Sequence, residues 1–297
     1  EIYTLSLHDA LPILAFICVW LMLCAGIVSA QEERNSRVTI GMNNLNYTKQ
    51  DQKAKISTVF GAIADAIINK QVTTQRDNYQ DAVRAAIVKG FSQARRITVI
   101  DGKLSNDEVA RPNAYYVDAT VSNVSTTSKT EQSADKKKTI TYFKGVIGVI
   151  LHIKDAHTDE VVASPTFNVS DTDVSWVETA EGALNNALVR LSSAITAYSN
   201  RWLPLSANII EGARDKKDKQ KEVYIDLGSR EGASKGLHLA VYTMKTIAGK
   251  EAKKQIGRLK IESVEGNDIS LCKVQSGGKD IKAAIDAGET LLVQTTD

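Results

Sequence analysis

Cysteine is scarce in this chain of 297 residues, and its scarcity limits what can hold the fold together. Three cysteines occur, and Cys18 and Cys24 both lie in an apolar segment near the N-terminus. Only Cys272 lies beyond that segment, so the remainder cannot form an internal disulfide and must draw its stability from hydrophobic cores. Because Cys272 occupies an alternating position in the strand-like stretch ISLCKV, we expect a buried, unreactive thiol.

The patterns of common catalytic and metal sites are also lacking. The sequence contains neither the G-x-S-x-G turn of serine hydrolases nor the H-E-x-x-H helix of zinc proteases. His152 and His157 are close in sequence, but no nearby cysteine could complete a zinc site with them, and His238 stands apart. We therefore expect no catalytic residues, no metal site and no cofactor, and we interpret these histidines as strand and turn residues.

Two glycine-containing stretches resemble phosphate-binding loops only superficially. Gly228, Gly232 and Gly236 recur at intervals of four, but no helix is expected after them whose N-terminus would face a phosphate. Residues 276–279 read Ser-Gly-Gly-Lys, but position 273 is not the glycine that a G-x-x-x-x-G-K-[ST] loop requires. We interpret both stretches as turns between strands.

Residues 1–13 do not resemble the start of a natural protein. They read EIYTLSLHDALPI, which looks like the in-frame translation of a sequencing adapter, and they begin with Glu1. A signal peptide normally opens with basic residues, whereas the first basic residue here is Arg34. We therefore leave residues 1–13 out of the functional interpretation. A natural but unusual N-terminus is the alternative.

Residues 14–30 have the composition of a secretory signal peptide. The run LAFICVWLMLCAGIVSA is apolar and ends with small residues, which predicts cleavage between Ala30 and Gln31. The run is too short, and too soon followed by charged residues, to indicate a membrane span. Acylation of Cys24 is the alternative, although the large residues before this cysteine do not suit it.

The composition after residue 30 indicates a soluble or peripheral protein. All 37 basic residues lie there, while two of the 35 acidic residues, Glu1 and Asp9, lie before it, so the net charge rises from +2 to +4. This charge is small and spread along the chain, which does not favour nucleic acid as a partner. No second apolar run is long enough to cross a membrane. We expect the periplasm of a bacterium, with a peripheral position at the outer membrane as a further possibility.

Hydrophobic periodicity predicts an α+β domain over residues 31–204, in which helices pack on a mixed sheet. Strands are predicted at residues 37–45, 96–101, 115–124, 139–155 and 160–169, and helices at residues 56–67, 77–95 and 177–198. The polar stretch TTSKTEQSADKKK between two of the strands is predicted to be a mobile hairpin loop. The apolar residues on both faces of the strand at residues 139–155 predict that it is buried under helices.

The pattern changes after Pro204, and residues 205–297 predict a small all-β barrel or sandwich. Six short strands separated by glycine turns are expected, at residues 207–211, 222–227, 237–242, 255–264, 269–274 and 290–294. The charged run ARDKKDKQKE is predicted to separate the first two strands, and a single helical turn is expected near residues 281–287.

The order of these elements resembles a group of bacterial envelope proteins. The stretch VTIGMNNL, two helices, ITVID, a long hairpin and a long final helix resemble the domain shared by three families. These are the curli assembly and transport component CsgG, the N-terminal domain of the translocation protein TolB and the middle domain of the flagellar protein FlgT. The stretch VYIDLGSREGASKGLHLAVY and the following IGRLKIESVEGNDISLCKV are similar to the C-terminal domain of FlgT-like proteins.

The resemblance implies an exported, non-catalytic accessory or assembly protein. Such a protein would bind envelope protein partners and self-associate into a ring, and its partner-binding residues are unknown from the sequence. Two alternatives stay open. The chain could form part of a CsgG-like outer-membrane secretion pore, or it could be a periplasmic hydrolase, because carboxylates are abundant.

Overall fold

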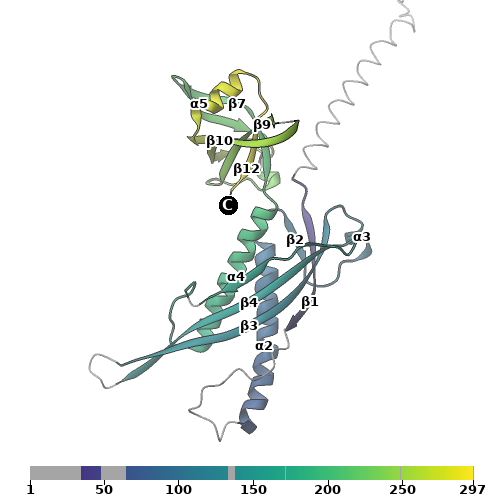
Figure 1. Cartoon of the computed structure of the whole chain (residues 1–297), viewed down its shortest axis with the longest axis vertical. Coiled ribbons are helices and arrows are strands. Elements are labelled where there is room, and N and C mark those ends of the chain that lie inside the picture. The colour runs from purple at the N-terminus through teal and green to yellow at the C-terminus, as the bar shows by residue number, and fades with distance from the viewer. Residues whose placement is uncertain (1–34, 48–64, 133–137, 171, 248, 297) are drawn as a thin grey trace, which may run out of the picture. The chain divides into compact units, whose positions relative to one another are not determined.

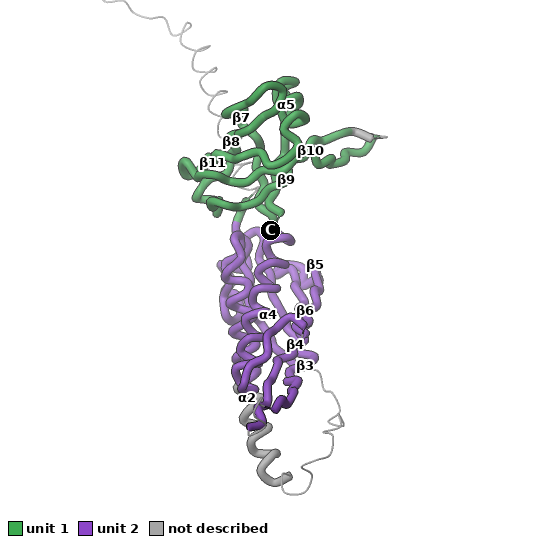
Figure 2. The backbone as a smooth tube through the Cα atoms, turned by 90° about the vertical axis from the view of Figure 1, so that its left-hand side faces the viewer, with its two compact units in different colours: residues 1–36, 204–297 green, residues 37–203 purple. Residues whose placement is uncertain are grey.

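The computed structural model describes residues 35–47, 65–132, 138–170, 172–247 and 249–296. The chain divides into two compact units, which Figure 2 colours separately. The sheet unit is Arg37–Leu203, and the barrel unit is residues 204–297 together with Asn35 and Ser36. The coarse expectation of a mixed sheet with helices, followed by a small β barrel, is confirmed.

Six strands form the sheet of the sheet unit (Figure 1). They are β1 (Val38–Tyr47), β2 (Ile97–Ile100), β3 (Ala114–Gln132), β4 (Thr139–Asp155), β5 (Val161–Ala163) and β6 (Thr166–Val169). Their order is β2-β1-β3-β4-β5, and β6 also pairs with β4. β1 is parallel to both of its neighbours, whereas β3, β4, β5 and β6 pair in antiparallel fashion, so the sheet is mixed.

Three helices belong to this unit: α2 (Asp65–Ser92), the short α3 (Asn106–Val109) and α4 (Ala180–Trp202). α4 begins at Thr179, whose hydroxyl accepts a hydrogen bond from the N–H of Gly182 at 3.1 Å. Its buried apolar residues (Ala183, Leu184, Ala187, Leu191 and Ile195) follow the helical period, and the last three pack with the buried face of α2 and the sheet in one core.

Two expectations for this unit are corrected. The stretch predicted as a mobile loop is largely strand, because β3 continues to Gln132 in register with β4. β4 is covered tightly on one face only: Ile147 and Val149 are buried, whereas Val146 and Ile150 on the other face are half-buried.

The helical prediction is changed as well. α2 runs without interruption from Asp65 to Ser92, where a break near residues 68–76 was expected. The start of the first predicted helix, at residues 56–64, lies outside the described residues.

The barrel unit is a closed six-stranded barrel with the order β10-β11-β8-β7-β12-β9. Its strands are β7 (Ser206–Lys216), β8 (Lys219–Ile225), β9 (His238–Ile247), β10 (Lys250–Val264), β11 (Ser270–Ser276) and β12 (Leu292–Thr295). A 3-10 turn, η1 (Ser229–Glu231), and the helix α5 (Gly278–Asp286) complete the unit. The inward-facing apolar residues of all six strands form one core, to which Ile281 and Ala284 of α5 also belong.

Two predictions for the barrel are wrong in detail. The charged run ARDKKDKQKE does not separate two strands, because β7 and β8 pair as far as Lys216 and Lys219 and the run forms the hairpin itself. The single turn expected near residues 281–287 is a nine-residue helix, α5. Its apolar residues Ile281, Ala284 and Ile285 follow the helical spacing, and they pack against the barrel core.

The stretch before β1 is attached to the barrel unit. The side chain of Asn35 donates a hydrogen bond to the carbonyl of Ser206 at 2.8 Å and accepts one from its N–H at 2.9 Å. Among the described residues, no helix is both long and apolar enough to cross a membrane.

Candidate functional site

The residues predicted for processing fall outside the described part of the chain. Cys24, Ala30 and Gln31 all precede Asn35, where the description begins. Cleavage after Ala30 and acylation of Cys24 therefore stay predictions.

The three histidines lie at separate places and have local partners. His152 of β4 shares a hydrogen bond of 2.9 Å with the hydroxyl of Ser164. His157 lies in the turn after β4, and His238 begins β9, where its Nδ1 is 3.2 Å from the Gln275 side chain. Within the described ranges, no three His, Cys, Asp or Glu side chains are grouped closely enough to hold a metal ion.

Cys272 lies inside the barrel, as its alternating position predicted. Its side chain is fully buried, and burial raises the pKa of the thiol to about 12. A thiol with this pKa is protonated at neutral pH, which together with its burial makes it a poor nucleophile.

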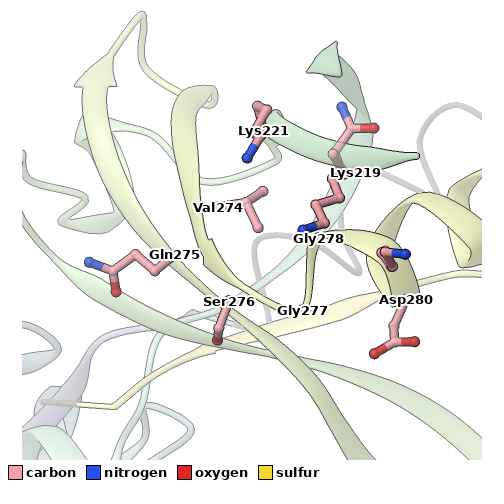
Figure 3. A pocket seen from close by; sticks show the side chains of 10 residues that line it. Lys219, Lys221, Val274, Gln275, Ser276, Gly277, Gly278 and Asp280 are labelled. Carbon is pink, nitrogen blue, oxygen red and sulfur yellow. The ribbon is translucent and has the colours of Figure 1, made fainter. Parts of the chain in front are cut away.

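The Gly277–Gly278 turn forms one wall of a hollow of about 330 Å³ on the barrel (Figure 3). Lys219 and Lys221 of β8 line the hollow, together with the end of β11 and the start of α5. Gly277 has a φ of +76° and directly precedes α5, so the stretch 276–279, which was predicted to be a turn between strands, leads into a helix. The nearby Lys279 is paired with Asp218 at 2.6 Å, so its charge is already compensated.

A more prominent feature is the far part of the β3–β4 hairpin, which we call the ribbon. The ribbon consists of residues 124–132 of β3 and residues 139–147 of β4. β1 pairs with β3 only as far as Val121, and β6 pairs with β4 only as far as Ile147. Figure 1 shows the two strands continuing together beyond the other strands. A two-stranded ribbon is only marginally stable by itself, so other contacts must hold it.

Those contacts come from the segment between β6 and α4 and from α4 itself. Phe143 and Val177 exchange two backbone hydrogen bonds, of 2.7 and 3.0 Å. Gly145 lies against α4 so closely that any side chain there would collide with the carbonyl oxygen of Ala183. The base of the ribbon is therefore fixed in place.

Aromatic and basic side chains gather on one face of the ribbon. Lys129 pairs with Tyr142 across the two strands, and successive side chains of a strand alternate between faces, so Lys144 lies on the same face as both. The ammonium groups of Lys129 and Lys144 each lie 4.8 Å from the ring centroid of Trp176, and Lys129 is also 5.6 Å from the ring of Tyr142. We call these four residues the ribbon cluster.

The ribbon cluster is accessible and preorganised. Trp176 and Tyr142 are half-buried, and Lys129 is paired with Glu131 at 2.6 Å. The cation–π contacts favour one orientation of the indole ring, and Trp176 stays partly exposed. Trp and Tyr are residue types enriched in protein interfaces, where they supply large rigid contact areas.

Sequence reasoning missed this cluster. Lys129 was predicted to lie in a loop, and no role was predicted for Trp176. Residues 125–132 are polar throughout and give no strand pattern, and no local pattern shows that Trp176 folds onto them.

Comparison with known proteins gives no family. No protein-family model matches the chain, and no curated protein matches it. Among solved structures, a neuraminyllactose-binding hemagglutinin homolog from Helicobacter pylori has 9% identity and a TM-score of 0.29, with 57% of this chain and 83% of that chain covered.

Two other solved structures have similar scores. A DUF330 protein from Xanthomonas campestris has 15% identity and a TM-score of 0.30, covering 57% of this chain and 84% of that chain. A hypothetical protein from Chlamydia trachomatis has 11% identity and a TM-score of 0.30, covering 56% of this chain and 98% of that chain. The likeness in all three is too low to support an argument about fold or function.

Proposed function

We propose that this chain is an exported, non-catalytic accessory protein of a bacterial envelope, which acts by binding protein partners through the ribbon. The observation that carries the proposal is the ribbon cluster. Lys129, Tyr142, Lys144 and Trp176 are held in one orientation on a hairpin that extends beyond its own sheet.

The apolar segment at residues 14–30 supports the export part of the proposal. It ends with small residues before Gln31, as a cleaved secretory signal does. A periplasmic protein of this kind would meet its partners between the two membranes or at the inner surface of the outer membrane.

The resemblance to CsgG, TolB and FlgT-like proteins supports the assembly part. In this proposal the sheet unit corresponds to the domain shared by these families, and the barrel unit corresponds to the FlgT-like C-terminal domain. A ring of several copies is one arrangement in which the ribbon would contact the next subunit.

Site-specific photo-cross-linking in cells tests the binding function. A photoreactive residue placed at Tyr142 is expected to form a defined cross-link to an envelope protein or to a second copy of the chain. The matched control is the same residue at Val189, which is 58% exposed on α4 of the same unit.

The cross-link at position 142 should also depend on the cluster. A Trp176→Ala substitution is expected to weaken it strongly while leaving the circular dichroism spectrum unchanged. Identical products from positions 142 and 189, or a cross-link indifferent to Trp176→Ala, would contradict the proposal.

A further inference from the structure

The β9–β10 hairpin extends from the barrel as an arm, made of residues 243–247 and 250–254 (Figure 2). Its two strands pair with each other throughout, from Lys254↔Thr243 to Lys250↔Ile247. The arm is separate from the ribbon, since the two hairpins belong to different units.

One edge of this arm is open. β12 pairs with β9 only as far as Leu292↔Tyr242, and the chain before Leu292 turns to β7, where Leu291 accepts a hydrogen bond from Ile209 at 3.1 Å. Within the described residues, Thr243 and Met244 therefore have β10 on one side and no strand on the other. Such an edge presents unpaired backbone donors and acceptors to an added strand.

Two hollows flank this edge. Thr243, Lys245 and Glu289 line both of them, and the Thr243 hydroxyl donates to the Glu289 carboxylate at 3.0 Å. One hollow, of about 310 Å³, continues over Lys254 and α5. The other, of about 580 Å³, continues over Met244, Lys253 and Leu292. Because alternate side chains of a strand point to opposite faces, a strand added here would place them in the two hollows in turn.

The chemistry of the hollows indicates what such a strand would carry. The larger hollow contains Met244, which is 43% exposed, and the half-buried Leu292, so it suits an apolar side chain. The arm itself carries four exposed lysines against a single acid, Glu251. The lysines are Lys245, Lys250, Lys253 and Lys254. Glu289 lines both hollows and Asp280 lines the smaller one, so the positive charge is partly offset there. The four lysines still outnumber these three acids, which favours an acidic partner.

We infer that the open edge of β9 binds an extended acidic segment of a partner protein, which adds to the barrel as a further strand with alternating apolar and acidic side chains. This inference rests on the proposed function, because it assumes a protein that works by binding. It adds a second site, on the barrel unit, and a chemical class of partner.

The test measures the binding of short capped peptides to the full chain in the form that the cell produces after any signal cleavage. A peptide that alternates valine and aspartate is expected to bind, and a peptide that alternates valine and lysine is expected to bind at least about tenfold more weakly. Two N-methylated forms of the first peptide, methylated at alternate residues, separate strand addition from simple charge attraction. Only one set of alternate amides faces the β9 edge, so methylation of that set should abolish binding and methylation of the other should not.

Variants of the arm complete the test. Lys254 lines the smaller hollow, which the aspartates of the peptide are expected to enter, so Lys254→Glu is expected to weaken binding of the valine–aspartate peptide about tenfold. Lys260→Glu is the matched control, because it makes the same charge change at an exposed position of β10 beyond the arm. Equal effects of the two N-methylated peptides, or of the two variants, would overturn the inference. Because these variants leave the ribbon intact, a retained cross-link at Tyr142 with no peptide binding would overturn the barrel site alone.

Discussion

Gly90 of α2 and Thr196 of α4 are joined where the two helices cross. The hydroxyl of Thr196 donates a hydrogen bond of 2.8 Å to the carbonyl of Gly90. A Cβ at Gly90 would lie only 2.8 Å from both the Cβ of Ile195 and the carbonyl oxygen of Ser192. The absence of a side chain at Gly90 is therefore what allows the helices to pack this closely over the sheet.

We predict that Gly90→Val destabilises the sheet unit by at least about 2 kcal/mol, because the added methyl groups force the helices apart. Ala194→Val, on the exposed face of α4, is the matched control and should cost less than about 1 kcal/mol. Urea unfolding followed by tryptophan fluorescence checks this, since Trp176 and Trp202 both lie in the sheet unit. Equal losses of stability from Gly90→Val and Ala194→Val would contradict the prediction.

The turn into α5 provides a second comparison. Gly277 and Gly288 both have positive φ, of +76° and +70°. A side chain at Gly277 would also collide with the carbonyl oxygen of Ile256, whereas the space beside Gly288 is open. We predict that Gly288→Ala costs about 1 kcal/mol through backbone strain alone, and that Gly277→Ala costs clearly more. Thermal unfolding of the two variants measures the difference. Equal stability of Gly277→Ala and Gly288→Ala would contradict the prediction, because the backbone around Gly277 would then have moved to avoid the collision with Ile256.

The buried thiol predicts a dependence of stability on alkaline pH. Burial raises the pKa of Cys272 from 9.0 to about 12, so the folded barrel binds this proton more tightly than the unfolded chain does. The resulting stabilisation is complete below about pH 9 and is lost as the pH rises towards 12, at up to about 1.4 kcal/mol per pH unit.

Comparison with Cys272→Ala isolates this contribution. The variant should show a shallower loss of stability between pH 9 and 12 in circular dichroism. In native protein at neutral pH, mass spectrometry should find the Cys272 peptide unmodified by an alkylating reagent. Rapid alkylation of the native thiol would contradict the burial.

The loop that carries Trp176 is predicted to loosen in acid. The Asp173 carboxylate accepts hydrogen bonds from the hydroxyl and the N–H of Ser170, at 2.6 and 2.8 Å, and these bonds lower the pKa of Asp173 below 3.8. The stabilisation is therefore present above about pH 4 and is lost as the pH falls through the lowered pKa.

Tryptophan fluorescence in a Trp202→Phe background should report this change at Trp176. Asp173→Asn should remove the acid dependence and give the loosened signal at all pH values. If Asp173→Asn leaves the acid transition unchanged, the transition arises from another carboxyl group and the prediction is wrong.

The sequence predicts those elements that a run of apolar residues or a single apolar face marks. β4 has the expected limits, Thr139–Asp155, because apolar residues on both faces mark its length, and α4 keeps one apolar face along its length. β3 beyond Val124 was missed because Ser, Thr, Lys and Gln occupy both faces there, and such a composition is typical of loops. Pairing with β4 makes this stretch a strand, as the contact between the Thr130 and Thr141 hydroxyls at 3.3 Å illustrates.

The candidate sites were less predictable than the fold. The ribbon cluster depends on the path of the chain between β6 and α4, which brings Trp176 onto Lys129 from 47 positions away in the sequence. The open edge of β9 exists because β12 begins only at Leu292 and does not extend alongside the arm. The relative lengths of paired strands depend on tertiary packing. Neither the position of Trp176 nor the start of β12 relative to β9 can be read from local hydrophobic periodicity.

The central claim is that the chain is exported and acts in the envelope, and one measurement tests it directly. Residues 1–13 are replaced by a start codon and a short basic segment, as a secretory signal requires. The protein is then expressed in bacteria, the cells are fractionated and the intact mass is determined. We predict a periplasmic species that begins at Gln31. A membrane-bound species that begins at an acylated Cys24 would keep export but change the mode of attachment. An unprocessed protein in the cytosol would contradict the claim.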